Sequence, residues 1–145
     1  MRSYLLSIKQ DPFDALVRGQ KKHEFRRKFS EIRANFLAVF YVSSPVKAIM
    51  GVAEFGPVVK DKIPALLDLA RAHSWDHPLE LIAGYFAGCK YGYALPLISA
   101  KTLEKPISLE RLKKLVPDFR PPQSFLSLDN PKYSRIKKEA LGRGA

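Results

Sequence analysis

Cysteine is nearly absent from this chain: Cys89 is the only one in 145 residues. A single cysteine excludes an internal disulfide and cannot by itself form a zinc site, so we interpret it as a small packing residue. Long apolar runs are missing too, since none approaches the roughly 20 residues that span a bilayer. Lys9 and Asp11 end the first apolar stretch too early for a signal peptide. We therefore expect a cytoplasmic protein that contacts no membrane.

The common catalytic signatures are also lacking. The sequence has no Gly-rich phosphate loop, no nucleophile elbow and no pair of metal ligands at helical or zinc-finger spacing. Its three histidines, His23, His73 and His77, are scattered, as surface or capping histidines are. We therefore expect no metal and no cofactor, and the spacing of residues leaves open whether the protein is an enzyme.

Positive charge is what the chain has in excess. Lysine and arginine number 25 against 14 aspartates and glutamates, which gives a formal net charge of +11. Such an excess favours a polyanionic partner, because neutralising phosphates releases counterions. Acidic proteins and anionic membranes also attract basic surfaces, but no long basic amphipathic helix is visible, so nucleic acid is the favoured partner. A charge that only keeps the protein soluble is the alternative.

The first elements of a fold can be read from the N-terminal residues. The length and the 46% apolar content fit one domain with a single core. Residues 4–9 alternate in the way of a strand with one buried face. A helix should follow, with Asp11 as its N-cap and Gly19 at its left-handed C-cap.

A hairpin is expected in the middle of the chain. Residues 36–42 form a nearly continuous apolar run, and extended character resumes over residues 46–55. Two strands joined by so short a turn make a hairpin, with Ser43, Ser44 and Lys47 near its tip.

The second half alternates between helices and strands. We expect a helical insertion at about 61–88. Residues 63–73 show helical spacing, and a second helix after residue 78 would bury Leu79, Ile82, Ala83 and Phe86. Beyond it we expect a strand at 91–98, in which Pro96 requires an edge or a bulge, a helix from Ser108 to Leu115 and a strand at 124–128.

Basic residues dominate the C-terminal end. We predict one domain over residues 1–130, followed by a basic tail over residues 131–145. The tail has too few apolar residues to pack firmly, so we expect a loosely held helix or disorder there. The chain shows no internal repeat, and we expect a monomer.

Residues 19–26, Gly-Gln-Lys-Lys-His-Glu-Phe-Arg, are the most informative stretch. Along a strand Glu24 and Arg26 fall on one face, about 6.5–7 Å apart, and Phe25 points the other way into a core. Lys21 would project from the turn after Gly19 into the same partly open cleft. A lysine, a glutamate and a forked arginine suit a phosphate or a nucleobase edge. A solvated edge strand with an incidental Glu–Arg pair would show the same spacing.

The same residues match the G-x-K-x-x-E-x-R signature of ASCH domains, small proteins of the PUA-like superfamily. The chain resembles this family over residues 3–128, in the order of its elements as well as in the motif. The stretches that carry the likeness are the strand at 5–9, the hairpin at 41–52, Tyr-Ala-Leu-Pro-Leu at 93–97 and Pro-Pro-Gln-Ser-Phe at 121–125. The resemblance implies an α+β fold, a PUA-like mixed β-barrel with helices packed around it.

The resemblance also implies a function. ASCH domains are thought to bind RNA or act on it in a cleft lined by the signature lysine, glutamate and arginine. Some PUA-like relatives cage modified bases, and some ASCH proteins resemble ribonucleases. One small ASCH group hydrolyses acetylcytidine with a lysine at the position of Lys21, but it has a threonine where this chain has Glu24, and it needs a second glutamate, for which Glu80 is the candidate.

We therefore expect binding of RNA, other single-stranded nucleic acid or a modified nucleoside. The alternatives are a hydrolase acting on RNA or nucleosides, with Lys21 as base and Glu24 as its catalytic partner, and a regulatory adaptor that binds a protein. Exposed aromatics beside basic residues suit unpaired bases, and Tyr41, Trp75, Tyr91 and Tyr93 are candidates for the cleft wall. The expected nucleic-acid-binding residues are Lys21, Glu24, Arg26, Arg27, Lys28, Ser43, Ser44, Lys47 and Tyr91.

Overall fold

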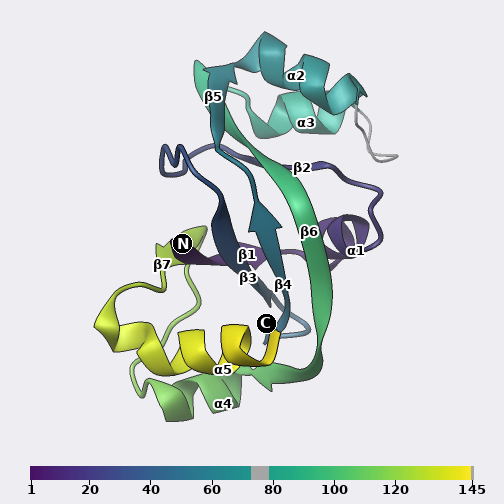
Figure 1. The fold of residues 1–145 in the computed structure, drawn as a ribbon. Coiled ribbons are helices and arrows are strands. Elements are labelled where there is room, and N and C mark those ends of the chain that lie inside the picture. Colours follow the sequence, from purple (N-terminus) through teal and green to yellow (C-terminus); the bar gives the residue numbers. More distant parts are fainter. Residues whose placement is uncertain (73–78, 145) are drawn as a thin grey trace.

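A strongly curled mixed sheet runs through the molecule in the computed structural model, which describes residues 1–72 and 79–144 (Figure 1). The strands follow the order β2-β6-β4-β3-β1-β7, and β5 pairs with β6 as well. β1 and β3 are parallel, and the other pairs are antiparallel. The strands are β1 (Ser3–Ile8), β2 (His23–Arg26), β3 (Phe36–Val42), β4 (Ala48–Phe55), β5 (Val59–Lys62), β6 (Tyr91–Ser108) and β7 (Phe125–Ser127).

Both faces of β1 are buried, so the expectation of one exposed face is wrong. Tyr4 and Leu6 pack on one side with residues of helix α1 (Gln10–Val17), in what we call the α1-side core. Leu5 packs on the other side beneath the C-terminal helix α5 (Ser134–Gly144), in what we call the α5-side core. Because both of its faces are covered, β1 has little room for polar side chains. Apart from Tyr4, its polar residues are the small serines Ser3 and Ser7.

Helix α1 ends as predicted but begins earlier. Lys9 occupies the N-cap without a side-chain hydrogen bond, and Asp11 lies in the first turn, so the prediction of Asp11 as cap is wrong. Gly19 has a φ of 74°, which confirms the left-handed conformation at the end of the helix. The amides of Gln20 and Lys21 both donate to the carbonyl oxygen of Ala15, at 2.9 and 3.1 Å. These two hydrogen bonds hold the turn after α1 against the last turn of the helix, and they fix the backbone position of Lys21.

The predicted hairpin is confirmed, since β3 and β4 pair antiparallel with a register shift between Phe40 and Tyr41. Strand β6 is longer than expected. Pro96 lies where β6 passes from its pairing with β5 to its pairing with β4, so its missing N–H interrupts no ladder on that side.

Helices α2 (Ile63–Ala72) and α3 (Leu79–Tyr85) pack together at one end of the sheet (Figure 1). Phe86 and Leu66 are buried there against Ala94 of β6, in what we call the α2–α3 cluster. The burial of Phe86 is as predicted, whereas Ala83 is exposed. His73, Trp75 and His77 lie outside the described residues.

The C-terminal residues form a packed helix, so the expectation of a loose tail is wrong. Helix α5 (Ser134–Gly144) follows a short 3-10 helix (Pro131–Tyr133) and buries Ile136 and Ala140 completely in the α5-side core. Helix α4 (Leu109–Leu115) packs beside it, and its predicted cap is confirmed: Ser108 Oγ accepts from the amide of Arg111 at 3.1 Å. Within the described part of the chain, no helix has the length and apolar character needed to cross a membrane.

Candidate functional site: a buried lysine–glutamate–arginine triad

The structure brings Lys21, Glu24 and Arg26 together. Lys21 Nζ lies 2.5 Å from Glu24 Oε1, and Arg26 Nε donates to Glu24 Oε2 at 3.1 Å. The side chains of Glu24 and Arg26 are each 7% exposed and that of Lys21 is 13% exposed. Lys21 is therefore the member of this triad that reaches nearest to solvent.

The triad is more deeply buried than the predicted cleft. Glu24 and Arg26 do share one face of β2, but that face looks into the protein, because Glu24 is paired with Leu95 of the α1-side core. Phe25 faces the other way and is only half-buried, against the smaller α2–α3 cluster. The alternation was predicted correctly, and the relative burial of the two faces was not.

Arg26 joins the two ends of the sheet. Its Nη1 donates to the carbonyl oxygen of Ser124, just before β7, at 3.2 Å, and its Nη2 donates to the carbonyl oxygen of Ser7 in β1 at 2.9 Å. β2 and β7 are the first and last strands of the sheet order, so one guanidinium bridges the seam of the curled sheet. With Nε directed at Glu24, all three nitrogens of Arg26 have protein acceptors.

The surroundings of Glu24 favour its ionised form. Burial by itself would raise the pKa of this carboxyl group, but the charges of Lys21 and Arg26 and their hydrogen bonds outweigh burial and hold the pKa below its usual value. A buried carboxylate between two cations is a stable anchor, and it fixes the position of the Lys21 ammonium.

Arg27 and Lys28 are exposed immediately beyond β2. The amide of Arg27 donates to Tyr85 Oη at 3.1 Å, and its Nε lies 3.3 Å from Cys89 Sγ. These contacts tie Arg27 to the end of α3. Arg27 therefore leaves β2 on the side of the helices, opposite to the triad.

The residues of the hairpin tip contact two different parts of the fold, β1 and the start of α4. The amide of Ser43 donates to the carbonyl oxygen of Ile8 at 3.0 Å, one residue along β1 from the carbonyl that Arg26 contacts. Ser44 and Lys47 are exposed, and the carbonyl oxygen of Lys47 accepts from Leu109 at the start of α4. Ser43 thus lies on the side of the triad, and Lys47 lies on the side of α4.

The candidate aromatic residues separate into buried and exposed positions. Tyr41 is buried in the α5-side core, where burial raises the pKa of its hydroxyl, so its assignment to a cleft wall is wrong. Tyr91 is 46% exposed at the start of β6, and Tyr93 is half-buried two residues later. Lys60 of β5 lies beside both rings, and it was not among the predicted residues, because residues 59–62 contain one apolar side chain and show no alternation.

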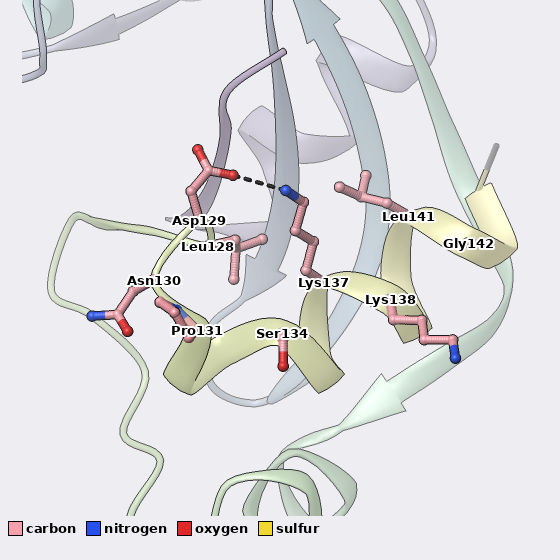
Figure 2. A pocket seen from close by; sticks show the side chains of 9 residues that line it. All are labelled: Leu128, Asp129, Asn130, Pro131, Ser134, Lys137, Lys138, Leu141 and Gly142. Atoms are coloured by element: carbon pink, nitrogen blue, oxygen red, sulfur yellow. Dashed lines mark hydrogen bonds and ion pairs between the residues drawn. The ribbon is translucent and has the colours of Figure 1, made fainter.

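A separate hollow lies between α5 and the loop before it, with a volume of about 470 Å³ (Figure 2). Lys137 Nζ forms an ion pair with Asp129 Oδ1 at 2.8 Å across it, and Ser3 Oγ donates to the same carboxylate. Burial would raise the pKa of Asp129, but Lys137 and Ser3 lower it. These contacts fix α5 to β1, which is a structural role. The hollow is lined by Leu128, Asp129, Asn130, Pro131, Ser134, Lys137, Lys138, Leu141 and Gly142.

Among the described residues, no group of three or more histidines, cysteines, aspartates or glutamates is placed to hold a metal ion. The polar chemistry available at the triad is that of one ammonium, one carboxylate and one guanidinium.

The chain is similar to known proteins in both sequence and structure. No family model matches the sequence. A protein of Zymomonas mobilis named ASCH domain-containing ribonuclease is 28% identical over 122 residues, which cover 84% of this chain and 81% of that one. The crystal structure of ASCH from Zymomonas mobilis superposes with a TM-score of 0.77 and 25% identity over 92% of each chain.

A more distant structure shares the fold. The human THYN1 protein, solved in complex with DNA containing 5-methylcytosine, has a TM-score of 0.54 and 12% identity, covering 94% of this chain and 95% of that one. The chain is therefore similar to ASCH domain proteins in sequence and in structure, and its curled mixed sheet with surrounding helices confirms the expected PUA-like α+β fold.

Proposed function

We propose that this protein binds RNA, with Lys21 as the cation that meets a phosphate or a base carbonyl. The observation that carries this proposal is the fixed position of the Lys21 ammonium, which contacts the buried carboxylate of Glu24 at 2.5 Å while its side chain stays 13% exposed. A cation held in place loses less conformational entropy on binding than a free lysine on a surface. Two positive charges and one negative charge leave the triad with a net positive charge for a polyanion.

Glu24 and Arg26 act in this proposal as supports. The N–H groups of Arg26 already donate hydrogen bonds to Glu24, Ser7 and Ser124. A ligand that replaced one of these acceptors would break a contact across the seam of the sheet. Glu24 in turn has one oxygen directed at Lys21 and the other at Arg26. Their contribution to binding is the geometry they impose on Lys21.

Other features agree with a nucleic-acid ligand. The net charge of +11 favours polyanions over neutral partners. Arg27 and Lys28 are exposed cations just beyond β2, with Arg27 on the side of the helices, and Ser43 lies on the same side as the Arg26 contact with β1. The related protein of Zymomonas mobilis is named a ribonuclease, which makes RNA the first ligand to test.

Cleavage of RNA is the second candidate function, and the name of that relative is the observation that favours it. Cleavage would need a base for the attacking hydroxyl group, and Lys21 is the candidate at the triad. To act as a base, Lys21 would have to give up its proton, and its ion pair with Glu24 would be lost with the charge. Binding without cleavage requires no such loss, so we place binding first.

The proposal is tested by titrating the protein into a fluorescent single-stranded RNA and recording anisotropy at several salt concentrations. Binding should weaken with salt by about 0.7 log units per log unit of salt for each phosphate that is neutralised. Affinity that does not change with salt would remove the argument from charge. The same samples, run on a denaturing gel, separate the two candidates, since a binder leaves the RNA intact and a ribonuclease shortens it.

A further inference from the structure

Two lysines of β5 and two tyrosines of β6 form a strip on one face of the sheet. Lys60 is paired with Tyr93 and Lys62 with Tyr91, and residues paired across antiparallel strands point to the same side. Lys60 Nζ lies 5.7 Å from the ring centroid of Tyr91 and 5.9 Å from that of Tyr93. We call these four residues the tyrosine–lysine strip.

At Tyr91 and the two lysines, the strip lies on the face that α2 and α3 do not cover. The opposite face of the same strands is covered by α2 and α3, so closely that a Cβ added to Gly92 would lie 2.4 Å from a ring carbon of Phe86. On the strip face, Lys60 and Lys62 are exposed, and Tyr91 is 46% exposed. Unlike Tyr93, Tyr91 packs against none of the three hydrophobic clusters found among the described residues.

The strip continues into the triad without a break in register. Tyr93 has Lys60 as its partner on one side and Arg26 as its partner on the other, and Leu95 is paired with Glu24. One face of the sheet therefore carries, in order along β6, the exposed Tyr91, the half-buried Tyr93 and then the buried carboxylate. A chain lying along this face from Tyr91 would be led toward the triad.

We propose that the tyrosine–lysine strip binds single-stranded RNA, with bases stacked on Tyr91 and Tyr93 and the ammonium groups of Lys60 and Lys62 at the phosphates. This inference rests on the RNA binding proposed above and names the form of RNA and the surface that it follows. Rings on a sheet surface accept the faces of unpaired bases, which a duplex keeps stacked inside. The lysines keep their flexible stems and reach phosphates as point charges.

The acidic residue Glu31 contacts the strip and would oppose the ligand. Glu31 Oε1 lies 3.7 Å from Lys60 Nζ, and the Glu31 side chain is 64% exposed. Asp61 also belongs to β5, but it is paired with Gly92 and points to the helix-covered face. Removing the charge of Glu31 should therefore release Lys60 for phosphate and strengthen binding, which an incidental lysine would not show.

The experiment measures the affinity of a fluorescent single-stranded RNA for the full chain and four variants. Tyr91→Ala should weaken binding about fivefold or more, as the loss of one stacking ring does. Tyr91→Phe keeps the ring and should recover most of that loss. Lys60→Ala should lower the salt slope by about 0.7, the share of one phosphate, and Glu31→Gln should raise the affinity.

Lys105→Ala is the matched control, because Lys105 is an exposed lysine at the other end of the same strand β6. It should bind as the unchanged protein does. If the unchanged protein binds RNA and Tyr91→Ala binds equally well, the strip proposal is overturned and the proposed function stands. If the unchanged protein binds no RNA, the proposed function fails and this inference fails with it.

Discussion

Glu24 and Arg26 lie two residues apart on β2, and Arg26 Nε donates to Glu24 Oε2 at 3.1 Å inside the protein. This pair connects two properties of the molecule. Through Arg26 it bridges the seam between β2 and the strands β1 and β7, and through Glu24 it holds the ammonium of Lys21. These residues of the motif thus contribute to stability, and in the proposed function they also position the cation that binds RNA.

Replacing Arg26 should destabilise the fold strongly. Arg26→Met fills a similar volume but leaves the Glu24 carboxylate and the carbonyl oxygens of Ser7 and Ser124 without this donor. Breaking a buried ion pair by removing one partner costs about 3–5 kcal/mol. Urea denaturation measures the free energy of unfolding, with Arg33→Met as control, since Arg33 is exposed. A loss of less than about 1 kcal/mol would mean that the seam does not depend on Arg26.

Stability should fall in acid because of Glu24. Its pKa is lowered in the folded state, so the unfolded chain takes up a proton first as the pH decreases. The stabilising contribution is complete above the unfolded value of about 4.3 and is lost as the pH falls through the lower folded pKa.

The free energy of unfolding of Glu24→Gln should therefore depend less on pH in this acid range than that of the unchanged protein. Asp118→Asn is the control, because the carboxyl group of Asp118 pairs with Lys132 at the surface, where solvent screens the charges; it should change the pH dependence less than Glu24→Gln does. If Glu24→Gln and the unchanged protein lose stability in parallel, Glu24 is not the group responsible.

The C-terminal helix should be required for stability. Ile136 is completely buried in the α5-side core, so Ile136→Ala should cost about 2–5 kcal/mol through lost contacts and the cavity left behind. Lys138→Ala, on the exposed side of the same helix, should change stability by no more than about 0.5 kcal/mol. Thermal unfolding followed by circular dichroism compares the two. Equal melting temperatures would show that α5 is not part of the cooperative unit.

The contact between β6 and the helices α2 and α3 should be sensitive to one methyl group. At Gly92 a Cβ would meet side-chain atoms of Phe86 at 2.4 Å and Leu66 at 2.8 Å, so Gly92→Ala should cost about 1–3 kcal/mol by overpacking. Gly84→Ala is the control, because Gly84 lies in α3 with nothing near the new Cβ, and alanine favours a helix. Hydrogen exchange should show faster exchange of α2 and α3 in Gly92→Ala alone.

Elements with strong local signals could be predicted from the sequence. Ser108 caps α4 because its side chain has the amide of Arg111 within reach, and Gly19 ends α1 because it tolerates a positive φ. The packing of α5 was missed, although Ile136 and Ala140 are four residues apart, the spacing of one helix face. Two apolar residues on one face are enough to pack a helix when that face lies against an existing hydrophobic core.

The site was predictable only in part, because its burial depends on contacts between distant segments. Alternation put Glu24 and Arg26 on one face, but it could not show that this face meets Ser124, far along the chain. The pairing of Lys60 with Tyr93 is likewise a tertiary contact between strands separated by two helices.

The role of Lys21 is tested most directly by the affinity of single-stranded RNA for Lys21→Ala and Lys21→Arg, in samples whose folding is checked by thermal unfolding. Lys21→Arg keeps the positive charge, so it should bind RNA more tightly than Lys21→Ala, which should lose about tenfold, the value of one hydrogen bond from a charged group. Binding by Lys21→Ala that equals that of the unchanged protein would contradict the account. RNA cleavage by the unchanged protein that both substitutions abolish equally would show instead that Lys21 serves as a base, because guanidinium stays protonated.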